Sequence, residues 1–364
     1  MTRSLVLALL IPALAAVAQE TVPELTGSLP FNIDSRSGRV ERLAITIGDG
    51  GTGPYKAVLW GEPTLPTHAF YRPRDLRPFS RQNPLPIVAF ANGGCRNTSG
   101  EFRNMLSEIA SHGFLVMAIG PAGNAVVMGG EERQNMTAPS ELLDAVTWAI
   151  AENAREGSAY FGKIDVSKVA VMGQSCGAGQ AIEAADDPRV TTTIAFNQGV
   201  NLGGGRGPNP AAAAPNGAAP APGRGRGGPQ SVATDQRYAP TAPTLVRDPN
   251  APPRAQPANR AEFLEKLHGP ILFLSGGESD SGHRTATSNY EAIQTLPAVH
   301  AWEDVGHYPG TYRQPNGGDF AHVAGAWLLW QLKGDKTAAK LFVGASCDLC
   351  RDPKWKIERK NLPE

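Results

Sequence analysis

Apolar runs of strand length alternate with amphipathic segments along most of this chain. Continuous apolar runs predict strands buried on both faces, whereas apolar residues at helical spacing predict helices with one buried side. The predicted strands span residues 40–47, 55–60, 67–71, 85–91, 114–119, 169–172, 190–196, 271–274 and 299–302. The predicted helices span residues 101–112, 140–154, 176–185 and 320–332, with one more between the last two strands.

This alternation predicts an α/β fold with a mostly parallel sheet and helices on both of its faces. The first three strands are separated by short turns such as residues 48–53, so that end of the sheet is expected to be antiparallel. Residues 19–202 and 261–345 would then form a single domain. Residues 346–364 follow it as a C-terminal tail.

The segment 203–260 interrupts the pattern. It holds twelve Pro, nine Gly and thirteen Ala, and seven Arg against two Asp. Large apolar side chains are almost absent from it, so it cannot bury enough surface to offset the entropy lost on ordering. We expect a low-complexity insert without regular secondary structure, more a solvated linker than a surface that holds an anionic polymer.

The N-terminus is typical of a signal peptide. Arg3 precedes an apolar run at residues 5–17, and Ala16-Val-Ala18 provides a cleavage site. The alternative is a buried N-terminal helix. We expect residues 1–18 to be removed on export, which gives a secreted or periplasmic protein. No later apolar run is long enough to cross a membrane, so we expect no membrane insertion.

The charge balance argues against nucleic acid as a partner. The chain has 34 basic and 34 acidic side chains, and therefore no net charge to attract a polyanion.

A candidate nucleophile follows the strand at residues 169–172. Gly173-Gln-Ser175-Cys-Gly177 is a G-x-S-x-G sequence between a predicted strand and a predicted helix. In that context the serine lies on a sharp turn that exposes its hydroxyl at the carboxyl edge of the sheet. The alternative is an ordinary glycine-rich turn. The context favours a catalytic Ser175.

A base and an acid follow in the order that this architecture requires. Asp280 comes after the strand at 271–274, and His307 comes after the strand at 299–302. We therefore predict the triad Ser175, Asp280 and His307, with Glu278 as the alternative acid. A metal site at Glu278, Asp280 and His283 is disfavoured because their spacing matches no known ligand pattern.

Two loops are expected to stabilise a negative charge on the substrate oxygen. The Cys176 N–H follows the nucleophile, and Gly94 lies in the loop after the strand at 85–91, with Cys95 as the alternative donor. Because these loops face each other, we predict a Cys95–Cys176 disulfide, the alternative being two free thiols. Cys347-Asp-Leu-Cys350 predicts a second, structural disulfide.

These motifs resemble those of the secreted α/β-hydrolases, in particular the group of chlorophyllases, platelet-activating-factor acetylhydrolases and cutinase-like polyester hydrolases. The resemblance covers roughly residues 40–345 and rests on residues 86–95, 108–116 and 172–177. Gly306-His307, residues 326–330 and residues 333–335 add to it. It implies an eight-stranded, mostly parallel sheet, the triad above, and ester hydrolysis with neither a cofactor nor a metal. Gly94 and Cys176 stand where polyester hydrolases of this group carry an aromatic residue and Met. The insert takes the place of a lid without being amphipathic.

The sequence thus predicts a secreted serine hydrolase that cleaves a small-molecule or polymeric carboxylic ester through an acyl-enzyme. Two alternatives stay open at this point. The same triad could cut a peptide, lactone or polyester bond, or the scaffold could be a non-catalytic binding protein.

Overall fold

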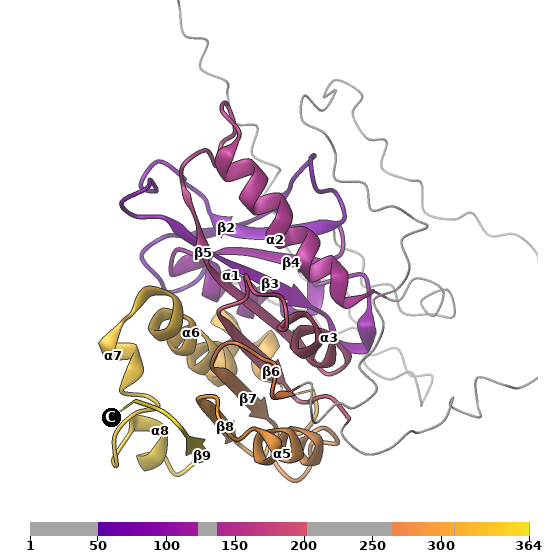
Figure 1. Ribbon diagram of the computed structural model, residues 1–364, viewed down its shortest axis with the longest axis vertical. Helices are drawn as coiled ribbons and strands as arrows, with labels where there is room; N and C mark the ends of the chain where they lie inside the picture. The colour runs from indigo at the N-terminus through magenta and orange to yellow at the C-terminus, as the bar shows by residue number, and fades with distance from the viewer. Residues whose placement is uncertain (1–49, 123–136, 202–263, 309, 364) are drawn as a thin grey trace, which may run out of the picture.

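The computed structural model describes residues 50–122, 137–201, 264–308 and 310–363 (Figure 1). The predicted signal peptide at 1–18, the predicted strand at 40–47 and the insert at 203–260 lie outside the described residues. The described strands form one sheet. They are β1 (Ala57–Gly61), β2 (His68–Pro73), β3 (Leu85–Ala91), β4 (Leu115–Ile119), β5 (Ile164–Gln174), β6 (Thr192–Phe196), β7 (Ile271–Ser275), β8 (Ala298–Trp302) and β9 (Lys356–Lys360).

The strands follow the order β1-β2-β4-β3-β5-β6-β7-β8-β9 across the sheet. The six inner strands β4, β3, β5, β6, β7 and β8 run parallel to one another. The pairings of β1 with β2, of β2 with β4 and of β8 with β9 are antiparallel. The mixed sheet with an antiparallel start was predicted correctly. The described part of the sheet has nine strands rather than the expected eight, because the C-terminal tail contributes β9 to its edge.

Helices cover both faces of this sheet (Figure 1). One apolar cluster unites residues of α2 (Pro139–Ala154), α3 (Cys176–Ala184) and α5 (His283–Ala292). The opposite cluster unites residues of α1 (Arg103–Ser111) and α6 (Gly318–Lys333). The remaining short elements are η1 (Gly93–Cys95), η2 (Gly100–Phe102), η5 (Gly310–Arg313), η6 (Pro315–Gly317), α7 (Lys336–Ala339) and α8 (Asp348–Arg351).

The central strand β3 shows why continuous apolar runs form this sheet. Every residue of β3 is buried, and its side chains alternate between the two clusters. Ile87 and Ala89 pack against the α2 side, whereas Val88 and Phe90 pack against the α1 side. A strand with apolar residues at every position satisfies both faces at once.

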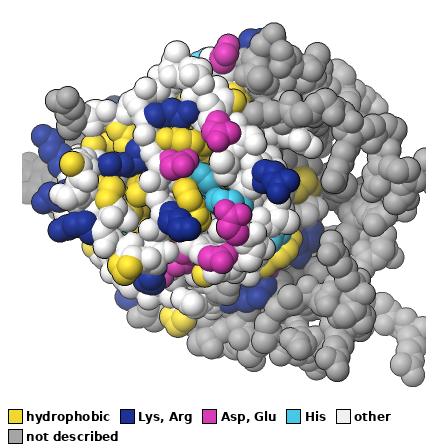
Figure 2. All heavy atoms as spheres, turned by 90° about the horizontal axis from the view of Figure 1, so that it is seen from below, with side chains coloured by type: hydrophobic (Ala, Val, Ile, Leu, Met, Phe, Trp, Pro, Cys, Tyr) yellow, Lys and Arg dark blue, Asp and Glu magenta, His cyan; other side chains and the backbone are white. Residues whose placement is uncertain are grey.

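Charges are mixed in sign on the face of the molecule seen in Figure 2. Figure 2 shows a face on which basic and acidic side chains are interspersed among apolar and histidine side chains, rather than gathered into a stripe of one sign. Among the described residues, no helix has both the length and the apolar character needed to cross a bilayer.

Candidate active site

Ser175 lies on a sharp turn between β5 and α3, with φ 53° and ψ −117°. Gly173 and Gly177 flank Ser175, and neighbouring backbone comes so close to both that neither position has room for a side chain. A Cβ on Gly173 would overlap the carbonyl of Gly177, and a Cβ on Gly177 would overlap the carbonyl of Ala91 in β3. The G-x-S-x-G spacing therefore lets the strand, the turn and the helix pack against each other while the serine side chain projects outward.

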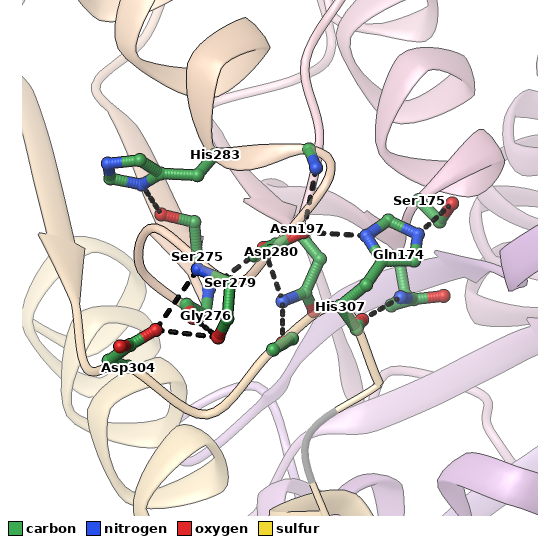
Figure 3. Close-up of polar contacts among 12 residues, drawn as sticks. Gln174, Ser175, Asn197, Ser275, Gly276, Ser279, Asp280, His283, Asp304 and His307 are labelled. Atoms are coloured by element: carbon green, nitrogen blue, oxygen red, sulfur yellow. Dashed lines mark hydrogen bonds and ion pairs between the residues drawn. The ribbon is translucent and has the colours of Figure 1, made fainter.

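The structure brings His307 to this serine. His307 lies in the loop after β8, and its Nε2 is 2.9 Å from Ser175 Oγ (Figure 3). The two residues are 132 positions apart in the sequence and meet because β5 and β8 end at the same edge of the sheet.

Asp280 completes a continuous chain of hydrogen bonds. It lies in the loop after β7, and its Oδ1 is 2.6 Å from His307 Nδ1 (Figure 3). The same carboxylate accepts hydrogen bonds from Gly282 N at 2.7 Å, Gly276 N at 2.8 Å and Asn197 Nδ2 at 2.9 Å. Both oxygens of this buried side chain are therefore saturated with donors.

These donors favour the ionised form of Asp280. Burial raises the pKa of Asp280, but the hydrogen bonds from His307, Gly276, Asn197 and Gly282 outweigh it and leave the pKa below its usual value. An ionised Asp280 can only accept, so Nδ1 of His307 carries the proton. Nε2 is then free to accept the proton of the Ser175 hydroxyl.

The loop that follows β3 faces the nucleophile. It forms η1, in which Gly94 has φ 65° and Cys95 has φ 50°. The Cys95 N–H donates to the carbonyl of Asn92 at 3.2 Å, and the Cys95 carbonyl accepts from Thr137 N at 3.0 Å. Cys176 is the first residue of α3, where a helix leaves its N–H groups without an intrahelical partner.

A disulfide joins these two segments. Cys95 and Cys176 are bonded with their Cα atoms 5.2 Å apart, and Cys347 and Cys350 form the second disulfide. The four described cysteines are thus all paired. The first disulfide connects the loop after β3 to the start of α3 beside Ser175.

A charged cluster supports the same loop. Arg96 Nε donates to the Gly93 carbonyl at 3.0 Å, and its Nη2 lies 2.7 Å from Glu101. Arg313 of η5 pairs with the other oxygen of Glu101 at 2.5 Å. One buried carboxylate therefore connects the loop after β3 to the segment that follows His307.

Tyr308 is a partly exposed aromatic residue beside the triad. Its side chain is 44% exposed, and its ring meets the His307 ring edge to face at 4.9 Å. Burial of the hydroxyl raises the pKa of Tyr308, while the Arg96 charge and the Ser175 side chain lower it. Tyr308 is thus partly exposed while its hydroxyl is withdrawn from water beside Ser175.

The competing acids and bases lie elsewhere. The Glu278 side chain is 86% exposed and approaches His283 only to 3.7 Å, without contacting His307. Asp304 accepts hydrogen bonds from Ser279. His322 is exposed on α6. Within the described residues, no group of three His, Cys, Asp or Glu side chains is arranged to hold a metal ion.

Three further polar residues take part in hydrogen bonds around the triad, and these contacts were not predicted from the sequence. Asn197 bonds Asp280, Tyr312 donates its hydroxyl to Asn197 Oδ1, and Gln174 Nε2 donates to the His307 carbonyl at 3.1 Å. Gln174 could have been noticed as the residue before the nucleophile. Asn197 could have been noticed only as a polar residue directly after an apolar strand.

Comparison with known protein families gives a match to one part of the chain. Residues 88–198 match the family model described as PET hydrolase-like, from β3 to just past β6. This match and the mostly parallel sheet show an α/β-hydrolase fold. The matched region includes Ser175 and the loop after β3, but neither Asp280 nor His307. Comparison with curated proteins gives no match.

Proposed function

We propose that this α/β-hydrolase-fold protein is a serine hydrolase that cleaves carboxylic esters through an acyl-enzyme. The observation that carries the proposal is the continuous hydrogen-bond chain from Ser175 through His307 to Asp280. The similarity of residues 88–198 to the PET hydrolase-like family supports an ester as the substrate.

The geometry supports a two-step reaction. In the first step His307 Nε2 takes the Ser175 proton while Oγ attacks the ester carbonyl, and the imidazolium then protonates the leaving alcohol. In the second step His307 takes a proton from water, and the resulting hydroxide attacks the acyl-enzyme. The imidazolium then returns this proton to Ser175 Oγ as the acyl–oxygen bond breaks, which releases the acid and restores the free enzyme. Asp280 stays ionised throughout and stabilises the imidazolium.

Two backbone donors would stabilise the oxyanion in each step. The Cys176 N–H is one, at the first position of α3. Gly94 is favoured over Cys95 as the second, because the Cys95 N–H already donates to the Asn92 carbonyl.

The substrate is a small-molecule or polymeric ester. The partly exposed ring of Tyr308, which lies beside His307, offers an apolar contact for the acyl or alcohol group. Cleavage of a peptide or a lactone by the same triad is the alternative, and a substrate panel separates the two. Ester hydrolysis needs no bound cofactor or metal in this mechanism, since all proton transfers are made by protein side chains.

Export is part of the proposal. Two disulfides join the four described cysteines, and structural disulfides are typical of oxidising compartments. Together with the signal-peptide pattern at residues 1–18, they support a secreted or periplasmic protein.

Active-site labelling tests the proposed function. A serine-reactive phosphonate should label the wild-type protein at Ser175, and p-nitrophenyl esters of increasing chain length should be hydrolysed. Ser175→Ala should lose both. Ser288→Ala removes an exposed hydroxyl on α5 that bonds the Arg284 carbonyl, and it should leave both intact. A wild-type protein that is neither labelled nor active on any ester, peptide or lactone would refute catalysis and favour a binding role.

A further inference from the structure

Behind the acid of the triad lies a second, fully buried polar chain. Asn197 follows β6 and is completely buried, and its Nδ2 donates to Asp280 Oδ2 at 2.9 Å and to the Gly306 carbonyl at 3.4 Å (Figure 3). Tyr312, buried in η5, donates its hydroxyl to Asn197 Oδ1. The Asn197 amide, itself in the loop after β6, therefore connects the loop of Asp280, the loop of Gly306 and η5.

The chemistry of the end groups fixes the direction of every bond in this chain. An ionised Asp280 can only accept, so the Asn197 NH₂ must face it. The amide oxygen then faces Tyr312, and the phenol must donate to it. The Tyr312 ring packs edge to face against the rings of Phe102, Phe196 and Phe320. These contacts hold the ring, and therefore its hydroxyl, in a fixed position.

The backbone holds Asn197 in place as well. Its φ is 55°, in the left-handed region that asparagine tolerates better than most residues. Its N–H donates to the Leu274 carbonyl at 2.7 Å, which ties it to the end of β7. A Cβ on Gly282 would overlap the Asn197 carbonyl, so the loop of Asp280 packs directly onto this turn.

We propose that Asn197, oriented by Tyr312, is a positioning residue that holds Asp280 ionised and aimed at His307. This inference rests on the proposed function of the triad. Asn197 is the one side-chain donor to Asp280, among the described residues, other than His307 itself. Its second bond, to the Gly306 carbonyl, fixes the residue immediately before His307.

Other titratable groups surround the chain and stay in place in the variants below. His307 bonds the Asp280 carboxylate, and the His283 N–H donates to the Asp280 carbonyl at 3.0 Å. Burial lowers the pKa of His300, and the charge of Asp280, which also reaches this residue, raises it. At the other end of the chain, burial raises the pKa of the Tyr312 hydroxyl, and electrostatic interactions with Glu101 and Tyr308 raise it further. Loss of the Asn197 donor removes one hydrogen bond that stabilises the ionised carboxylate of Asp280. We therefore expect the proton affinity of the Asp280–His307 pair to rise.

Two variants test the proposal. Asn197→Asp keeps the shape but places a carboxylate oxygen against Asp280. Tyr312→Phe removes only the hydroxyl that orients the amide. We expect kcat/KM for a p-nitrophenyl ester to fall roughly ten- to a hundredfold in Asn197→Asp and roughly tenfold in Tyr312→Phe, as for loss of a hydrogen bond to a charged group. The acid limb of the pH profile should move to higher pH in both.

Matched controls separate positioning from stability. Asn289→Asp alters another fully buried amide, which bonds the backbone of Val200, and Tyr160→Phe alters a buried tyrosine packed against Trp148. Asn289→Asp should lower the unfolding temperature, because it disturbs two buried hydrogen bonds to Val200, and neither control should move the acid limb. Folded Asn197 and Tyr312 variants with wild-type kcat/KM, or with a loss equal at every pH, would overturn the proposal.

A second readout does not depend on turnover. The proton shared between His307 Nδ1 and Asp280 Oδ1 gives a far-downfield proton resonance whose pH midpoint follows the pair. Both variants should move that midpoint upward, and an unchanged midpoint would refute the role of Asn197. Absence of labelling and turnover in the wild-type protein would instead refute the proposed function.

Discussion

The Cys95–Cys176 disulfide joins the two segments that we assign to the oxyanion, and its removal gives the sharpest test of that assignment. Cys95→Ala/Cys176→Ala deletes the bond without changing any backbone donor. The cost in stability follows from the loop that the bond closes. A separation of 81 residues gives about 4.5 kcal/mol of loop-closure free energy.

The effect on catalysis is smaller than the loss of a donor. Loss of a whole oxyanion donor lowers kcat by roughly 10²–10³-fold. Here Thr137 still holds the Cys95 carbonyl through its N–H and its hydroxyl, at 3.0 and 3.1 Å. The loop therefore keeps part of its position, and we expect kcat to fall roughly tenfold, with KM for a short aryl ester changing much less.

The second disulfide provides a matched control. Cys347 and Cys350 are three positions apart, so Cys347→Ala/Cys350→Ala should cost only about 1.6 kcal/mol and leave kcat unchanged. Urea unfolding at pH 7 gives both free energies, and initial rates with p-nitrophenyl acetate give kcat. Equal losses of stability in the two double variants would refute the loop-closure estimate. A wild-type kcat in Cys95→Ala/Cys176→Ala would refute the idea that the bond positions the oxyanion donors.

Three further predictions address the turn, the acid and the pH dependence of stability. Gly177→Ala should abolish labelling by a phosphonate because its Cβ overlaps the Ala91 carbonyl, whereas Gly179→Ala, whose Cβ meets only a carbonyl at 3.9 Å, should fold and gain up to about 1 kcal/mol. Asp280→Asn should lower kcat roughly 10⁴-fold and Glu278→Gln less than twofold, and the reverse ranking would identify Glu278 as the acid. Burial, with a smaller contribution from His283, lowers the pKa of His300 to about 3. Because the unfolded chain then binds this proton more readily, the free energy of unfolding should be highest above the unfolded pKa near 6.5 and should decline as the pH falls toward 3. About 2 kcal/mol should be lost by pH 5, and urea unfolding of His300→Gln should lack that component.

Much of the fold could be predicted because the inner strands are buried on both faces. The range 85–91 matches β3, and the strands at 271–274 and 299–302 are each one residue short. The N-terminal part of β5 was missed because Asp165, Ser167 and Lys168 interrupt its apolar run, although Leu85 pairs with Ile164 there. β9 was missed for a similar reason. Its Lys356-Ile-Glu-Arg-Lys360 sequence pairs through the backbone, which side-chain pattern does not reveal.

Part of the candidate site could likewise be predicted from the sequence, and part could not. Ser175, Asp280 and His307 each follow an apolar strand, so the prediction that parallel strands end at one edge was enough to group them. The hydrogen bonds that link Tyr312, Asn197 and Asp280 could not be predicted, because an amide and a phenol have many structural uses. Their role depends on which atoms lie within hydrogen-bonding distance, and this is set by the packing of loops that are far apart in the sequence.

The antiparallel pairing of β9 with β8 bears on how the protein can be shortened. A chain ended at residue 345, where the sequence pattern sets the domain boundary, would lose the outermost strand and uncover the hydrogen-bonding groups of Ala298–Trp302. An apolar strand with unpaired N–H and C=O groups is a template for association with a second chain. The charged strand β9 thus covers the backbone of β8, and truncation before β9 would favour aggregation even with every residue of the triad intact.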